Sequence, residues 1–174
     1  MVVLWTTDTP GHRICIDYLK EMSVPVRVIF YPAELPKEAQ TVFLLGTPKI
    51  RNLSGRKFLN FHGGDPERYR GHDCLWWAIL DRNLDAVVTT LHIATEELDG
   101  GPILAKHKIR SRLAKDIYRD NMENCAWLIW CYLNKLIEQE SPQTMKGRMC
   151  KRMTAIEKQE AERIWDEEVQ SVSK

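Results

Sequence analysis

An apolar run, a helical pattern and a second apolar run open the sequence, and this order limits the fold more than any other feature. Residues 2–6 and 26–31 are short and rich in β-branched and aromatic residues, which is typical of buried strands. Between them, apolar residues recur near helical spacing over 14–22, after a turn in which Asp8 or Thr9 caps the helix. A strand, a helix and another strand in this order predict a parallel sheet.

The remaining segments continue the alternation of strand and helix patterns. The fold class is therefore α/β, a Rossmann-like, mostly parallel sheet flanked by helices. The 174 residues suit one main domain over 1–140, followed by a basic link and a C-terminal helix over 141–174. Further strands are predicted at 41–45, 57–61, 86–94 and 103–109, and helices at 73–82, 113–140 and 154–170.

The charge balance and the cysteines limit which binding partners and which cellular compartment are expected for the protein. Lys and Arg total 25 against 24 Asp and Glu, whereas a phosphate backbone calls for a basic surplus, so nucleic acid is not expected. No apolar run reaches transmembrane length, and residues 1–15 lack the cationic start of a secretory signal, so no membrane partner is expected. The five cysteines form no CxxC pair, which is typical of a reduced, cytoplasmic protein.

The densest chemical signal is the triplet Asn60-Phe61-His62 at the end of a predicted parallel strand. Open α/β sheets bind ligands beyond the carboxyl ends of such strands. Residues two apart in a strand share a face, so the amide of Asn60 and the imidazole of His62 point into the same crevice. An amide can donate to an oxyanion, and an imidazole transfers protons near neutral pH. The alternative, an edge histidine beside a turn-forming asparagine, is favoured if the pair is taken alone.

Two further segments fit either a site or ordinary surface loops. Residues 63–71 contain paired glycines, which let a ligand approach the backbone closely, together with two arginines and a tyrosine. Residues 92–104 run from His92 through an acidic loop to Asp99 and two glycines. Asp99 either forms a turn or orients a histidine and stabilises its cation. We interpret His92 as a hydrogen-bonded structural residue, because it lies inside a strand.

The histidines do not predict a metal site. The spacing of His62, His72 and His92 matches no ligand pattern, and the carboxylates near them are turn residues. We expect His12 and His107 on the surface and the cysteines in the core. No metal is therefore expected.

Taken together, these segments resemble the formyltransferases that use 10-formyltetrahydrofolate. That family includes enzymes that act on glycinamide ribonucleotide, initiator methionyl-tRNA and amino-sugar nucleotides. Order and spacing agree over about residues 41–110. The matching residues are Asn60-Phe-His62, Pro66-Glu-Arg-Tyr69-Arg-Gly71, Trp77-Ala-Ile79, Thr90-Leu-His92 and Asp99-Gly-Gly101-Pro-Ile103.

The resemblance implies a formyltransferase-like catalytic domain over 1–140 with a triad of Asn60, His62 and Asp99. The substrate amine attacks the formyl carbon, Asn60 hydrogen-bonds the developing oxyanion, and His62 manages the proton of the amine. Asp99 holds the histidine and a water, so that the proton reaches the departing folate nitrogen. The expected formyl donor is 10-formyltetrahydrofolate, an activated acyl donor that needs no metal.

The resemblance also implies binding residues for the donor and for the acceptor. The residues implied for the folate cleft are Leu45, Gly46, Ile50, Ala94, Thr95, Glu96, Glu97 and Leu98. Those implied for the substrate loop are Gly63, Gly64, Arg68, Tyr69 and Arg70.

The sequence departs from the family's pattern in two places. Residues 63–66 read Gly-Gly-Asp-Pro where the family has Ser-Leu-Leu-Pro, which removes a hydroxyl and apolar bulk and adds a carboxylate. Asn60 also comes well before its usual place, so we expect a shortened N-terminal half and a shallower folate pocket.

Among the family's acceptors, an amino sugar linked to a nucleotide fits best. The chain has no room for a second, RNA-binding domain, and its net charge of +1 disfavours tRNA. Asp8 would repel the phosphate of glycinamide ribonucleotide at the start of the first helix. The diphosphate of a sugar nucleotide is expected to contact Arg68, Arg70 or the basic link at 146–152. The link is alternatively a solvated connector.

Three functions stay open on the sequence alone. The first is an amino-sugar N-formyltransferase, and the second is a formyl-folate hydrolase or a formyltransferase for another small amine. The third is a non-catalytic module that binds folate or a nucleotide, which the shortened N-terminal half favours. The Trp-rich pattern over 113–140 is apolar almost all round, which indicates burial, and a homodimer is one way to provide it.

Overall fold

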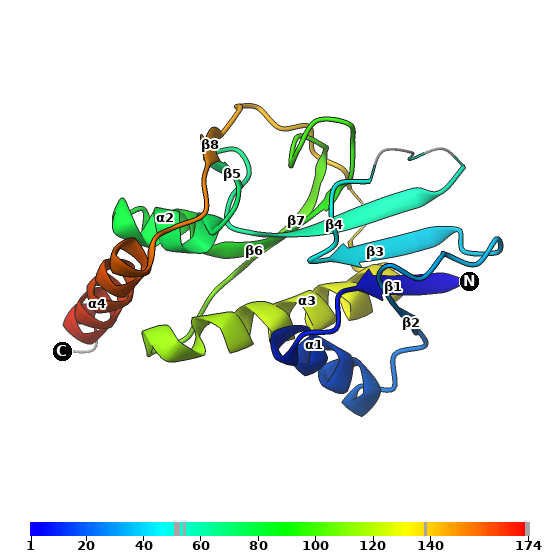
Figure 1. Ribbon diagram of the computed structural model, residues 1–174, viewed down its shortest axis with the longest axis horizontal. Coiled ribbons are helices and arrows are strands. Elements are labelled where there is room, and N and C mark those ends of the chain that lie inside the picture. The colour runs from blue at the N-terminus through cyan, green and yellow to red at the C-terminus, as the bar shows by residue number, and fades with distance from the viewer. Residues whose placement is uncertain (51–52, 54, 138, 173–174) are drawn as a thin grey trace.

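A six-stranded sheet forms the centre of the protein (Figure 1). The computed structural model describes residues 1–50, 53, 55–137 and 139–172, and within them the strand order is β2-β1-β3-β4-β6-β7. The first four strands in that order are parallel, β6 is antiparallel to β4, and β7 to β6. The mostly parallel α/β sheet is thus confirmed. The strands are β1 (Val2–Thr6), β2 (Arg27–Phe30), β3 (Thr41–Leu45), β4 (Lys57–Gly63), β6 (Val88–Ile93) and β7 (Ile103–Lys108).

The register of the sheet places the two residues of the predicted site in one crevice. Leu44 of β3 lies opposite Asn60 of β4, so His62 extends beyond the end of its parallel neighbour. On its other side, Asn60 pairs with His92 of β6. Asn60 and His62 both border the same cavity, as their spacing of two residues predicts.

Two helices, α1 (Pro10–Glu21) and α3 (Ile117–Leu133), pack together on one face of the sheet (Figure 1). Phe43 is fully buried on this side, with its ring centroid 6.0 Å from that of Phe61 and 5.5 Å from that of Tyr132. Burial of such large apolar side chains fixes the layers against each other. No helix of the described residues is long and apolar enough to cross a bilayer.

The helix predicted over 113–140 is shorter in the structure. A 3₁₀ turn, η2 (Ala114–Asp116), leads into α3, which ends at Leu133. Lys135 has a φ of 57°, and a left-handed residue at this place stops a helix. Residue 138 lies outside the described residues. The sheet and α1 bury one side of α3, so the apolar pattern does not by itself require a second chain, and a homodimer stays a prediction.

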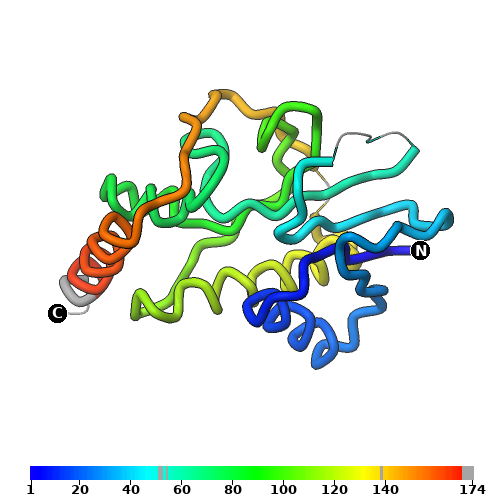
Figure 2. The backbone as a smooth tube through the Cα atoms, in the orientation of Figure 1, coloured from blue at the N-terminus to red at the C-terminus, as the bar shows by residue number. Residues whose placement is uncertain are grey.

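The C-terminal segment folds back onto the rest of the chain (Figure 2). Helix α4 (Ala155–Val172) packs on α2 (Cys74–Leu80), which a 3₁₀ turn, η1 (Leu84–Ala86), follows. Within the link, β8 (Arg148–Cys150) pairs in parallel with β5 (Tyr69–Gly71). The guanidinium group of Arg148 lies over the rings of Tyr69 and Trp77. The link is therefore anchored to the fold at these residues, while the side chains of its four cations stay exposed: Lys146, Arg148, Lys151 and Arg152. Positions 173–174 lie outside the described residues.

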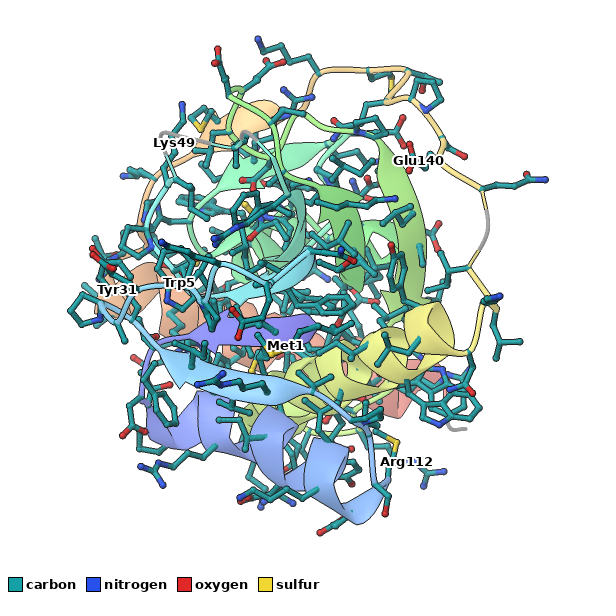
Figure 3. All side chains as sticks on the ribbon, turned by 90° about the vertical axis from the view of Figure 1, so that its right-hand side faces the viewer. Met1, Trp5, Tyr31, Lys49, Arg112 and Glu140 are labelled. Atoms are coloured by element: carbon teal, nitrogen blue, oxygen red, sulfur yellow. The ribbon has the colours of Figure 1, made fainter. Side chains whose placement is uncertain are left out.

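In the described part of the chain, loops rather than helices cover the other face of the parallel strands. Leu35, Ile50 and Leu53 from these loops pack on a cluster that includes the buried Val42 and Leu44. At the edge of this face, the ring centroids of Trp5 and Tyr31 lie 5.6 Å apart (Figure 3). Loops thus border the crevice on this side.

The start of α1 shows which of two candidate residues caps it. The hydroxyl of Thr9 accepts a hydrogen bond from the backbone N–H of His12 at 3.1 Å, whereas Asp8 bonds the guanidinium group of Arg13 at 2.7 and 2.8 Å. His12, which the sequence placed on the surface, is only 8% exposed, because the first turn of α1 directs its ring against Gly46. The five cysteines are buried, as expected.

Replacing Thr9 by alanine is expected to lower the free energy of unfolding by about 1 kcal/mol, because a backbone N–H of the first turn loses its partner. The control is Asp8→Ala, which removes an exposed ion pair with Arg13 and is expected to cost less. Urea denaturation of both variants measures the two effects. An equal or larger loss in Asp8→Ala would contradict the assignment of the cap to Thr9.

Candidate active site

A cavity with a volume of about 550 Å³ lies against β4, between the segment after β3 and the segment after β6. Gly46 and Ile50 belong to the first wall, and Ala94 and Leu98 to the second. This volume is typical of small-molecule sites, which combine apolar walls with a few converging polar groups. The polar groups that converge on it from β4, β6 and the turn after β6 are Asn60, His62, His92 and Asp99.

The structure brings the three side chains of the predicted triad together. Nδ1 of His62 lies 3.4 Å from Oδ2 of Asp99, and the amide of Asn60 donates to Oδ1 of Asp99 at 3.4 Å. The backbone N–H of Gly71 donates to Oδ2 of Asp99 at 2.9 Å. His62 and Asp99 are each 6% exposed, so water screens their interaction little. Two strand residues and one loop residue thus form a single polar cluster.

Hydrogen bonding fixes the orientation of the His62 ring. Nε2 lies 2.8 Å from the carbonyl oxygen of Tyr69, which can only accept, so Nε2 carries a hydrogen. In the neutral ring, Nδ1 then has no hydrogen and faces Asp99. Burial lowers the pKa of His62, and the charge of Asp99 offsets only part of that effect. Neutral His62 therefore presents Nδ1 as a proton acceptor near pH 7.

Asp99 is the fixed negative charge of the cluster. Burial alone would raise the pKa of Asp99, but the neighbouring His92, the charge that His62 gains in acid and the Gly71 N–H outweigh burial and hold this pKa at about 2. The carboxylate is therefore ionised near neutral pH and can stabilise a proton on Nδ1 of His62.

His92 connects β6 to the same cluster. Its Nδ1 donates to the carbonyl oxygen of Ile93 at 2.9 Å, so its Nε2 accepts from the Asn60 amide at 3.0 Å. One amide hydrogen of Asn60 is thus held by His92, and the other is directed at Asp99. His92 is buried and hydrogen-bonded, in agreement with its interpretation from the sequence.

Alternation along β3 places Leu45, which was assigned to the folate wall, and its neighbour Leu44 on opposite faces of the sheet. Leu44 borders the cavity, whereas Leu45 faces the opposite side of the sheet and lies in the core beneath α1 and α3. Glu96 is exposed and does not border the cavity. The other residues implied for the folate do border it: Gly46, Ile50, Ala94, Thr95, Glu97 and Leu98.

Of the two glycines in the predicted substrate loop, only Gly63 borders the cavity. Gly64 has a φ of 128°, and a Cβ there would lie 2.9 Å from Cβ of Cys74, so glycine is required by the backbone and by packing. Arg68 is directed outward and donates to the side chain of Asn83 at 3.4 Å. These two residues are therefore placed away from a ligand in the cavity.

Tyr69 and Arg70 are buried supports of the loop rather than groups that line the cavity. The hydroxyl of Tyr69 donates to Asp81 at 3.0 Å. Arg70 is 3% exposed, and its Nε donates to the carbonyl oxygen of Pro66 at 3.0 Å while Nη1 donates to Glu97 at 2.9 Å. With these bonds made inside the protein, Arg70 is not available as an exposed phosphate ligand.

Three further basic side chains border the cavity that the sequence did not name individually as site residues. Lys49 lies in the wall after β3 and is seen in Figure 3, His72 follows β5, and Arg152 comes from the segment after β8. The basic composition of the link was a signal for Arg152, but nothing local indicated His72. In the residues that the structure describes, no group of three or more His, Cys, Asp and Glu side chains is arranged to hold a metal ion.

No model of a known protein family matches the sequence, but the fold is similar to those of solved formyltransferases. Methionyl-tRNA formyltransferase from Clostridium thermocellum matches 88% of this chain and 73% of its own with a TM-score of 0.70 at 17% identity. PseJ from Anoxybacillus kamchatkensis was solved in complex with UDP-4,6-dideoxy-4-formamido-L-AltNAc and tetrahydrofolate. It matches 88% of this chain and 86% of its own chain with a TM-score of 0.62 at 17% identity.

HypX from Aquifex aeolicus, in complex with tetrahydrofolic acid, has a similar region. It matches 90% of this chain at 16% identity with a TM-score of 0.64, but this chain spans only 30% of HypX. These similarities confirm that the chain has the formyltransferase fold that its motifs resemble.

Proposed function

We propose that this protein transfers the formyl group of 10-formyltetrahydrofolate to the primary amine of a small acceptor, an amino sugar carried by a nucleotide. The observation that carries the proposal is the contact of Asn60, His62 and Asp99 beside one cavity. Among proteins of similar fold, PseJ was solved with tetrahydrofolate and a formamido sugar nucleotide. The apolar side chains of Ile50, Leu53 and Leu98 give the cavity walls that suit a flat pterin ring.

Asn60 supplies the donor for the charge that develops on the formyl oxygen. Its amide makes a 3.0 Å hydrogen bond to His92 and a longer, 3.4 Å contact with Asp99. An anionic oxygen replaces the longer contact more easily, while His92 keeps the amide in place. A preorganised donor of this kind stabilises the transition state more than the ground state.

His62 and Asp99 handle the proton that the acceptor amine loses. Nδ1 of His62 takes that proton as the new carbon–nitrogen bond forms, and Nε2 stays bonded to the Tyr69 carbonyl. The Asp99 carboxylate, 3.4 Å from Nδ1, stabilises the cation until the proton passes to the nitrogen that leaves. The folate supplies a formyl group already activated for transfer.

Positive charge at the cavity supports an acceptor that carries a phosphate group. Lys49 and Arg152 border the cavity, and Glu97, an exposed carboxylate in its wall, is paired with Arg70 and Lys146. Arg152 therefore replaces Arg68 and Arg70 as the residue that we assign to the diphosphate. A guanidinium group suits that ligand because it can form two parallel hydrogen bonds.

Replacing Arg152 by alanine is expected to raise KM for the sugar nucleotide by about 10- to 100-fold, because a charged hydrogen-bond partner contributes about 1.5–3 kcal/mol. Lys151→Ala is the matched control, since Lys151 lies one residue away and outside the cavity, near Glu157. Steady-state kinetics with varied acceptor measure both effects. An unchanged KM in Arg152→Ala would remove Arg152 from the acceptor site.

The proposed function is tested by incubating the protein with 10-formyltetrahydrofolate and a panel of amino-sugar nucleotides. Mass spectrometry then detects the gain of one formyl group on the acceptor, beside a control without protein. Transfer to one nucleotide supports the proposal and names the acceptor. Loss of the formyl group without a formylated acceptor would instead favour a formyl-folate hydrolase. Unchanged folate, with no heat of binding in calorimetry, would contradict both functions.

A further inference from the structure

The side chain of Gln143 connects the segment after α3 to the turn that carries Asp99. Its amide nitrogen donates to the carbonyl oxygens of Asp99 and Gly101, each at 2.8 Å. The segment itself is fixed by a pair of 2.8 Å backbone hydrogen bonds between Ser141 and Ile103. Both hydrogens of one side-chain amide are thus used on a single turn.

The same side chain also holds the loop that faces this turn. The amide oxygen of Gln143 accepts from Nη2 of the buried Arg70 at 2.5 Å. Arg70 precedes Gly71, and the N–H of Gly71 donates to the Asp99 carboxylate at 2.9 Å. Gln143 therefore contacts both partners of the Gly71–Asp99 hydrogen bond. It reaches the strand of Gly71, the donor, through Arg70, and it reaches Asp99, the acceptor, through the Asp99 backbone carbonyl.

The Asp99 turn needs such support because its backbone is unusual. Asp99 has a φ of 51°, a conformation that residues with a side chain rarely adopt. Two residues later, a Cβ on Gly101 would lie 1.8 Å from the carbonyl oxygen of Ile93, so the turn is also tightly packed against β6. An unfavourable backbone conformation persists only where neighbouring groups determine it, and the two bonds from Gln143 do so here.

We propose that Gln143 is a positioning residue that fixes the Asp99 carboxylate between His62, Asn60 and Gly71. The inference rests on the proposed function, which gives Asp99 its role. Gln143 touches no reacting atom, and its effect passes through the Asp99 backbone and Arg70. A segment that the sequence presents as a link thereby completes the site.

Two substitutions of Gln143 separate the hydrogen bonds that its amide donates from the one that its amide oxygen accepts. Gln143→Met keeps the length of the side chain and removes all three hydrogen bonds. Gln143→Glu retains an oxygen for Arg70 and removes the donors to the Asp99 and Gly101 carbonyls. The matched control is Thr144→Val, at the residue that follows Gln143 in the same segment. It removes the hydrogen bond from the Thr144 hydroxyl to Glu67 and leaves the Asp99 turn untouched.

Both Gln143 variants are expected to lower kcat by up to about 10²-fold, because a displacement of about 1 Å at a reacting group has that effect. KM for the folate donor is expected to change little, since Gln143 does not border the cavity. Thr144→Val is expected to keep the wild-type kcat. Wild-type kcat in both Gln143 variants, or an equal loss in Thr144→Val, would overturn the proposal.

A second readout does not depend on activity. The Gly71 amide proton reports the position of the Asp99 carboxylate, because the two form a charge-assisted hydrogen bond. In spectra of ¹⁵N-labelled protein, this proton is expected to move upfield and exchange faster in both Gln143 variants, and to stay unchanged in Thr144→Val. An unchanged Gly71 signal in the folded Gln143 variants would overturn the positioning role. If the wild-type protein formylates no acceptor, the proposed function fails, and the Gly71 signal still decides the role of Gln143.

Discussion

Asn60→Ala is expected to lower kcat for formyl transfer by about 10²- to 10³-fold, the loss typical of removing one oxyanion donor. The Asn60 amide can donate to the formyl oxygen while remaining anchored, because His92 holds one of its hydrogens. His62→Ala is expected to cost about 10²- to 10⁴-fold, because it removes the proton acceptor of the reaction. In both variants, donor binding is expected to persist, since the apolar walls are unchanged.

The controls are a histidine and an asparagine outside the site. His107→Ala, on β7, and Asn134→Ala, where the amide donates to the Trp130 carbonyl, are expected to keep wild-type kcat. Kinetics of all four variants are compared with calorimetry of folate binding and with circular dichroism. If the Asn60 and His62 variants bind folate and keep measurable function near that of the wild-type protein, the chain is a binding module and the enzyme assignment is wrong.

Acid is expected to destabilise the protein through two buried groups of the site, His62 and Asp99. Burial lowers the pKa of His62 in the folded chain, so below pH of about 6.5 the unfolded chain binds the proton more readily, and stability falls as pH falls. The pKa of Asp99 is held at about 2 when folded and is about 3.9 when unfolded. Its contribution, about 2–3 kcal/mol, is complete above pH of about 4 and is lost toward pH 2.

Asp99→Asn removes the second effect and, with it, the negative charge that partly offsets the lowered pKa of His62. The difference in free energy of unfolding between the wild-type protein and this variant is expected to shrink as pH falls from 5 toward 2. Glu67, whose pKa is also held at about 2, is present in both proteins, so its contribution cancels in the difference. Urea denaturation at a series of pH values measures the two curves. A constant difference across this range would mean that Asp99 is not the ionised, buried carboxylate described above.

The sequence predicts the sheet and the Asn60–His62 pair because both depend on short-range patterns. Strand runs and helical spacing set the order of elements, and the alternation of a strand puts Asn60 and His62 on one face. The residues alone left Asp99 as either a turn residue or a partner of a histidine, and only the resemblance assigned it to His62, because its distance along the chain says nothing about that contact.

The features that the sequence did not predict depend on long-range contacts. β5 and β8 are three residues each, too short to show a period, and they exist because they pair across the fold. Gln143 reaches the site only after the link folds back over it. The same holds for Arg152, which the sequence offered only as part of the basic link at 146–152. The expected placement of Leu45 in the folate wall failed by one residue, because a shift of one position in a strand reverses the face.

The most direct test of the account follows the formyl carbon itself. The protein is given 10-formyltetrahydrofolate labelled with ¹³C at the formyl group, together with the amino-sugar nucleotides, and the label is followed by NMR with wild-type protein and with Asn60→Ala. The account predicts that the label appears as a formamide on one acceptor with the wild-type protein and far more slowly with the variant. A label that stays on the folate, or transfers equally fast in both proteins, would contradict it.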